Sequence, residues 1–207
     1  MIHPRAAVPA GRGLNLNWPP LILGGGARIA DQRQVSGIVL AGVLDYYAKV
    51  WGRIAESELK EKMGLNEIYV GSWYPLQHLE LILKKIWQET PSRMRLAGEH
   101  TSKLIGDERR YERKFYTPEQ MLHETREAWQ HSFNFGEPDV ELVPGQTMIR
   151  VPRLPFKDPY WEDFLRGGIH GMLALSKAIE SEITIESKVD RENDQYVFTF
   201  RPKKKGR

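Results

Sequence analysis

Apolar residues recur at helical spacing along most of the chain. In Leu76–Trp87 they stand three or four positions apart, while charged residues occupy the opposite face. This spacing is typical of an amphipathic helix that buries one stripe. The same periodicity predicts a helix over Val35–Trp51. It also predicts a short charged helix near residues 54–63, which Gly64 would close.

Prolines mark the positions where several helices are expected to begin. Proline suits the first residue of a helix because the N–H that it lacks would have no partner there. The prolines in such positions are Pro75, Pro91, Pro118 and Pro159. Three of them follow a residue that can cap a helix, and these expected caps are Thr90, Thr117 and Asp158.

Four short runs towards the end of the chain alternate between apolar and polar residues. "DVELV" and "QTMIRV" form one pair, and "EITIESKV" and "QYVFTF" form another, each typical of a β-hairpin. The helix expected from residue 159 separates the two pairs. The order is therefore helices, hairpin, helix, hairpin. It predicts an α+β fold with helices packed on one face of an antiparallel sheet of about four strands.

The ends of the chain differ from its middle. Residues 1–34 are rich in proline and glycine and have no sustained period, which predicts an irregular N-terminal arm. Residues 35–202 are expected to form a single α+β domain, because hydrophobic residues make up 41% of the chain and charged residues 28%. The basic stretch 203–207 is expected to be a solvated, disordered tail.

Composition excludes several kinds of chemistry. The chain has no cysteine, so disulfides, thiolate metal sites and thiol catalysis are absent. Its apolar runs are shorter than the roughly 20 residues that cross a bilayer. The N-terminus has no pattern of a secretory signal. These features together predict a cytoplasmic protein.

No catalytic or metal-binding motif is visible. The six histidines include no pair with the His-Glu-x-x-His spacing, and His123 and His131 stand about 12 Å apart along one expected helix. "GGGAR" lacks the Lys-Ser/Thr ending of a phosphate-binding loop, and no nucleic-acid reader motif accompanies the basic tail. We therefore expect no enzyme, no metal site and no nucleic-acid partner, although an acid–base pair assembled from distant residues stays open.

Two local features each allow two interpretations. Trp73 and Tyr74 precede a helix, and they either anchor it as a hydrophobic staple or contact a ligand. The first interpretation is favoured. Gly167, Gly168 and Gly171 lie within one expected helix and clear space either for close packing against the sheet or for a ligand. Close packing is favoured because the same helix carries an apolar stripe.

Several stretches resemble an uncharacterised bacterial family known chiefly as a large paralogous family in myxobacteria. The stretches are "VSGIVLAGVLDYY", "YVGSWYPLQHL", "DPYWEDFLRGGIHGMLALSKA" and the terminal hairpin. The Ser-Trp-Tyr-Pro block is the most specific of them. The resemblance covers residues 35–202 and implies a fold more than an activity.

The second half of the chain is also similar to a wider group. This group includes vinyl-reductase-type small-molecule sensors, haem-nitric-oxide-binding domains and a Golgi-transport subunit that buries an acyl chain. The likeness rests on the order of elements and on "FLRGGIHGML". It implies a pocket for an apolar ligand or haem between helices and sheet. The ligand-binding candidates are Trp129, Phe133, Trp161, Gly168, His170 and Met172.

Haem binding is the feature of this group that the sequence supports least. The Tyr-x-Ser-x-Arg motif that clamps the haem propionates is missing from residues 147–159, and the stretch from Tyr111 has Arg113 and Phe115 where serine and arginine belong. His123 or His131 occupies the helix where a haem ligand would sit. Without the clamp, the sequence predicts no cofactor, haem included.

The residues and the resemblance together leave two functions. The first is a non-enzymatic sensory or regulatory domain that binds a small apolar ligand between helices and sheet. The alternative is a structural or partner-binding module whose core is filled by its own side chains. In the alternative, the N-terminal arm or an exposed sheet edge would contact a protein partner or a second copy of the chain.

Overall fold

The structure is a computed structural model that describes residues 33–108, 118–143, 146–153, 156–174 and 183–202. The predicted arm lies almost wholly outside this range, and the predicted basic tail lies wholly outside it. Both therefore stay predictions. Within the described ranges, no helix is both long and apolar enough to cross a membrane.

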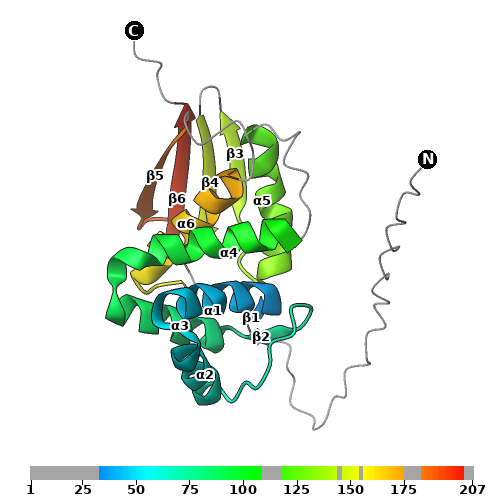
Figure 1. The fold of residues 1–207 in the computed structure, drawn as a ribbon. Coiled ribbons are helices and arrows are strands. Elements are labelled where there is room, and N and C mark those ends of the chain that lie inside the picture. Colours follow the sequence, from blue (N-terminus) through cyan, green and yellow to red (C-terminus); the bar gives the residue numbers. More distant parts are fainter. Residues whose placement is uncertain (1–32, 109–117, 144–145, 154–155, 175–182, 203–207) are drawn as a thin grey trace, which may run out of the picture. The chain divides into compact units, whose positions relative to one another are not determined.

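The helices come in two groups along the chain (Figure 1). The first group is α1 (Gly37–Trp51), α2 (Arg53–Lys62), α3 (Leu76–Glu89) and α4 (Met94–Glu108), with a 3-10 turn, η2 (Pro91–Arg93), leading into α4. The second is α5 (Pro118–Ser132) and α6 (Tyr160–Ala174), which stand before and after the first hairpin. The sequence predicted each of these helices, from its helical periodicity or from the proline at its expected start.

The four strands after α5 form one antiparallel sheet. They are β3 (Asp139–Val143), β4 (Gln146–Pro152), β5 (Ile183–Asp190) and β6 (Gln195–Pro202), in the order β3-β4-β6-β5. In the central pair, Ile149 lies opposite Phe198 and Val151 opposite Tyr196, and all four side chains are buried. This apolar face packs against α5 and α6. The predicted α+β fold, with its hairpin, helix and hairpin, is confirmed.

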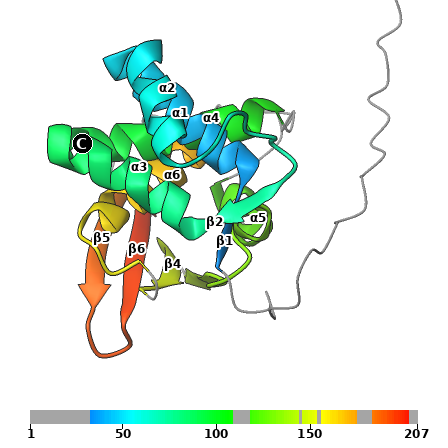
Figure 2. The same cartoon turned by 90° about the horizontal axis from the view of Figure 1, so that it is seen from below.

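A second, two-stranded sheet was not predicted. β1 (Gln34–Ser36) pairs with β2 (Trp73–Pro75) (Figure 2). Val35 also bridges to Phe133, the residue after α5. The sequence had predicted that Val35 begins a helix and that Pro75 is the first helical residue. Val35 is instead fully buried in an extended segment, which suits its β-branched side chain. Pro75 is extended, with φ −52° and ψ 135°, and α3 begins one residue later.

The two aromatics before α3 have different environments, which corrects the staple prediction in part. Trp73 is 42% exposed, so it does not anchor the helix in the core. Tyr74 is half-buried, and its hydroxyl accepts a hydrogen bond of 2.8 Å from the backbone N–H of Tyr69. The ring of Tyr74 also lies against Gly37, where a Cβ would stand 3.0 Å from it. Tyr74 is therefore the anchoring residue of the pair.

Replacing these aromatics should produce unequal losses of stability. We expect Trp73→Ala to lower the free energy of unfolding by about 1 kcal/mol, because much of its surface is already in water. Tyr74→Ala removes packing and a hydrogen bond, and should cost about 3 kcal/mol. Urea denaturation of both variants measures the difference. A loss of 3 kcal/mol or more for Trp73→Ala would restore the staple interpretation.

Candidate functional site

Helices α4 and α6 approach each other through glycines, and this contact forms one wall of the site. A Cβ on Gly167 would overlap the backbone carbonyl of Arg95. A Cβ on Gly98 would overlap the carbonyl of Phe164, and one on Gly171 would stand 2.5 Å from the carbonyl oxygen of Glu99. Close packing was predicted correctly for Gly167 and Gly171, but not for Gly168. Its partner is a helix, however, and not the sheet as predicted.

Gly168 behaves differently from its neighbours. A Cβ there would meet only the Ser102 hydroxyl oxygen, at 3.3 Å. Gly168 faces an apolar pocket between α4, α5, α6 and β4, with Val39 of α1 closing one side. The cavity within it has a volume of about 80 Å³. Helix contact and open space therefore alternate within one turn of α6.

The lining of the pocket offers little reactive chemistry. It is formed mainly by side chains such as Ile105, Ala128, Ile149 and Leu165. Two lining hydroxyls donate hydrogen bonds to their own helices: Thr101 to the carbonyl of Ala97 at 2.8 Å, and Ser132 to that of Ala128 at 2.7 Å. None of the described lining residues is ionisable. The site can therefore hold an apolar molecule, and its described lining offers no side chain suited to general acid–base catalysis.

Four of the six predicted ligand-binding residues line this pocket, namely Trp129, Phe133, Gly168 and Met172. The indole N–H of Trp129 donates a hydrogen bond of 2.8 Å to the carbonyl of Phe135, which fixes the ring at the pocket wall. Trp129 and Phe133 also contact each other, with ring centroids 4.7 Å apart. Their position fits the predicted role, but binding by these residues stays a prediction.

The other predicted site residues lie elsewhere. Trp161 is fully buried against Phe156, with ring centroids 4.5 Å apart, and belongs to the core. His170 points away from the pocket, and its Nδ1 lies 3.3 Å from a carboxylate oxygen of Glu99. Of the two haem-ligand candidates, His131 is exposed, and the side chain of His123 lies outside the described part.

Sequence reasoning missed the α4 wall of the pocket. Gly98, Thr101, Ser102 and Ile105 lie in a helix that was recognised only by its start and its period. Gly98 was the available signal, because a glycine inside a helix costs about 1 kcal/mol relative to alanine unless close packing requires it. Its position opposite the α6 glycines could not be known before the two helices were placed.

Comparison with solved structures identifies the fold. An H-NOX protein from S. oneidensis in the Fe(II)NO ligation state superimposes with a TM-score of 0.63 at 15% sequence identity, covering 81% of this chain and 99% of that one. An oxygen-binding H-NOX domain related to soluble guanylate cyclases gives a TM-score of 0.62 at 13% identity, covering 81% and 95%. An unliganded Fe(II) H-NOX variant from K. algicida gives 0.59 at 14% identity, covering 82% and 97%.

These likenesses establish the fold and not a family. No protein-family model matches the chain, and no curated protein matches it. The expected similarity to haem-nitric-oxide-binding domains is therefore confirmed at the level of the fold. The resemblance to the myxobacterial family and to the other members of the wider group stays a prediction.

The prediction that the chain takes no cofactor is wrong, because the fold is one in which solved structures bind haem. The solved structures that share the fold are haem domains, and one of them was solved in a study of heme distortion in the H-NOX family. The prediction relied on a missing clamp motif, but a fold can keep its pocket when a surface motif differs. Haem is therefore a candidate occupant that has to be tested.

The described residues provide only part of what haem would require. They contain no group of three or more metal-ligating side chains, although haem iron takes most of its ligands from the porphyrin and needs only an axial side chain from the protein. Among the side chains described at the pocket, Met172 has the thioether that can ligate haem iron. The cavity of about 80 Å³ is small beside the roughly 300 Å³ of an ordinary cofactor site. In the conformation described, this cavity is too small for a porphyrin.

Proposed function

We propose that this chain is a non-enzymatic sensory domain that binds a small apolar ligand in the pocket between α4, α5, α6 and β4. The apolar cavity facing Gly168 carries the proposal. A helix-rich protein of this size would normally fill such a space, because an empty volume forfeits packing contacts. The H-NOX fold supports the same proposal, since two of the structures compared have NO or oxygen bound.

A ligand in this pocket would act mainly on α5. Helices α4 and α6 are locked by backbone contacts at Gly98 and Gly167, which leave no room for sliding. Helix α5 and the residue after it meet the pocket through the larger side chains of Trp129 and Phe133. These can repack, and Val35 of β1 bridges directly to Phe133. Occupancy would thus be transmitted from the pocket to the start of the described chain.

The first experiment identifies the occupant. The full chain is expressed with and without a haem precursor, and its absorbance and native mass are recorded. A Soret band, or a mass increment released on denaturation, identifies haem or another carried ligand. The apo protein is then titrated with xenon and benzene, the apolar probes that fill engineered cavities of about 150 Å³. If the chain carries no ligand and neither probe binds, the proposal fails.

Filling the cavity from Gly168 should abolish binding without unfolding the protein. We expect Gly168→Leu to remain folded, because its Cβ has only the Ser102 hydroxyl to displace. Its affinity for any carried ligand or apolar probe should fall at least tenfold, because the added side chain occupies the same space. Glu61→Leu adds leucine at an exposed position of α2 and is the matched control. Unchanged binding in Gly168→Leu would contradict the assignment of the pocket.

A self-filled structural module is the second candidate function. The observation in its favour is the small cavity, about 80 Å³ against the roughly 150 Å³ that holds benzene in an engineered protein. On this alternative, Gly168→Leu would stabilise the protein by filling a void, and no ligand would be displaced. The same variant therefore separates the two functions.

A further inference from the structure

We propose that α4, α6 and β5 form a second site, which binds a phosphoryl oxyanion on the outer side of the helix pair. The site is a surface hollow of about 230 Å³, lined by Arg95 of α4, Arg166 and His170 of α6, and Ile185 of β5. It is separate from the apolar pocket, and it does not depend on the function proposed above.

The close contact of α4 and α6 at Gly167 places the side chains of this second site next to each other. Because Gly167 lies against the backbone of Arg95, two guanidinium groups from different helices open into one hollow. His170 follows Arg166 by four residues and therefore lies on the same face of α6. Like charges placed together repel each other, and a bound anion would relieve that repulsion.

Two polar atoms at this site lack a hydrogen-bond partner among the described residues. The Nε of Arg166 is buried and makes no hydrogen bond. Nδ1 of His170 makes none either, although a carboxylate oxygen of Glu99 lies 3.3 Å from it. A buried donor without a partner costs about 1–3 kcal/mol, so such atoms are uncommon unless a ligand satisfies them. Both atoms belong to side chains that line the hollow.

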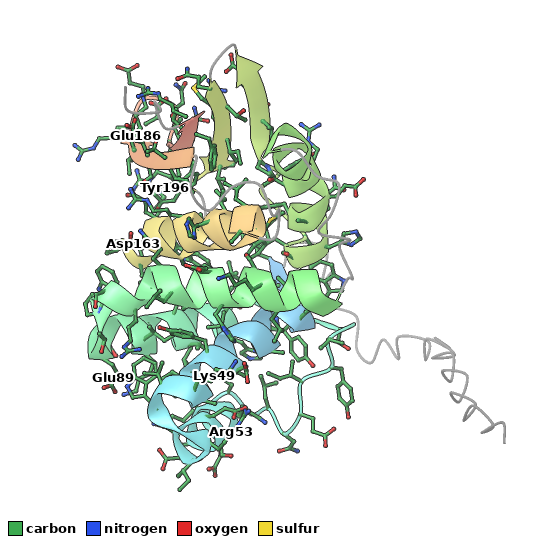
Figure 3. The ribbon with its side chains drawn as sticks, turned by 45° about the horizontal axis from the view of Figure 1, so that its top comes forward. Lys49, Arg53, Glu89, Asp163, Glu186 and Tyr196 are labelled. Atoms are coloured by element: carbon green, nitrogen blue, oxygen red, sulfur yellow. The ribbon has the colours of Figure 1, made fainter. Side chains whose placement is uncertain are left out.

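Among the described residues, carboxylates near the site leave the Arg95 and Arg166 guanidinium groups without a hydrogen bond. Asp163, labelled in Figure 3, lies 3.8 Å from Nη1 of Arg166, beyond hydrogen-bond distance. Glu99 makes its shortest contact with Lys103, at 2.7 Å. Burial would raise the pKa of Glu99, but Lys103, with His170 and Arg95 nearby, holds it below the ordinary value. Glu99 is therefore ionised and already paired.

A phosphoryl group suits the hollow better than a carboxylate does. Each guanidinium presents five N–H donors in a planar fork that matches two oxygens of one anion. A phosphoryl group has three oxygens, so it can accept from Arg95, Arg166 and His170 together. A carboxylate carries a single charge and presents its two oxygens in one plane, so it matches donors that converge from two helices less well.

The test is a titration of the full chain, labelled with ¹⁵N, by inorganic phosphate, phenyl phosphate and acetate at constant ionic strength. The shift of the Arg166 Nε–H resonance is followed. We expect saturable binding of phosphate or phenyl phosphate, with Kd of about 1 mM for a small anion. Saturation by both probes would show that free phosphate is sufficient for binding. Saturation by phenyl phosphate alone would identify a phosphorylated molecule.

Two variants and a control decide whether the hollow is responsible. Arg95→Gln and Arg166→Gln should each weaken binding about tenfold, because each removes charge-assisted hydrogen bonds. Binding to Arg95→Gln is still measured from the Arg166 Nε–H resonance. Arg166→Gln lacks that resonance, so its binding is measured by calorimetry. Arg191→Gln removes the same charge from an exposed position in the β5–β6 turn, about 20 Å along the strand from Ile185, and should bind normally. Acetate binding as tightly as phosphate, no saturation, or equal weakening by Arg191→Gln would each overturn the proposal.

Discussion

Phe156→Ala is expected to lower the free energy of unfolding by about 3–5 kcal/mol, the range for truncating a fully buried aromatic. Phe156 has no exposed surface and contacts four other aromatic rings, those of Trp129, Phe133, Phe135 and Trp161. It therefore joins Trp129 of α5 to Trp161 of α6. Thermal melting should show a fall on the order of 10 °C for a chain of this length.

Variants of two neighbours of Phe156 show how much of the expected loss comes from its buried ring and how much from its backbone hydrogen bond. Phe135→Ala truncates a half-buried ring at the edge of the same cluster and should cost less. Tyr196→Phe removes the hydroxyl that donates a 2.5 Å hydrogen bond to the backbone carbonyl of Phe156, which should cost about 1 kcal/mol. Burial raises the pKa of Tyr196, so this hydroxyl stays protonated at neutral pH. A Phe156→Ala loss no larger than that of Phe135→Ala would show that the cluster has a different centre.

Gly167→Ala should destabilise the protein by about 2 kcal/mol, whereas Gly168→Ala, one residue later, should not. Alanine improves the helix propensity by about 1 kcal/mol at either position. At Gly167 the new methyl group overlaps the backbone carbonyl of Arg95, which cannot rotate away, so the two helices must separate. At Gly168 the neighbour is a serine hydroxyl, which can turn aside.

Equilibrium denaturation of Gly167→Ala and Gly168→Ala compares their stabilities directly. We expect the midpoint to fall for Gly167→Ala and to stay level or rise slightly for Gly168→Ala. Gly98→Ala should resemble Gly167→Ala, because its Cβ would overlap the carbonyl of Phe164 from the other helix. Equal midpoints for Gly167→Ala and Gly168→Ala would mean that α4 and α6 do not pack through these glycines.

The sequence by itself determined the helices and the strands of the two hairpins, and their order. Periodicity located the helices, because a buried stripe must recur with the helical repeat, and alternation located the strands of both hairpins. The proline at the start of α5 was read correctly for the same local reason. These features depend on neighbours within a few residues, so they are visible without a tertiary structure. Together they were enough to predict the α+β fold.

Only the tertiary structure decided which elements meet and what lies between them. Val35 reads as part of a helix, but it is held as a strand by Tyr74 and Phe133, which stand far away in the sequence. Gly167 and Gly168 are indistinguishable as neighbours in a helix, yet one touches a backbone and the other faces a cavity. That difference is set by the position of α4. A pocket is the space that distant elements leave between them, so no local pattern specifies it.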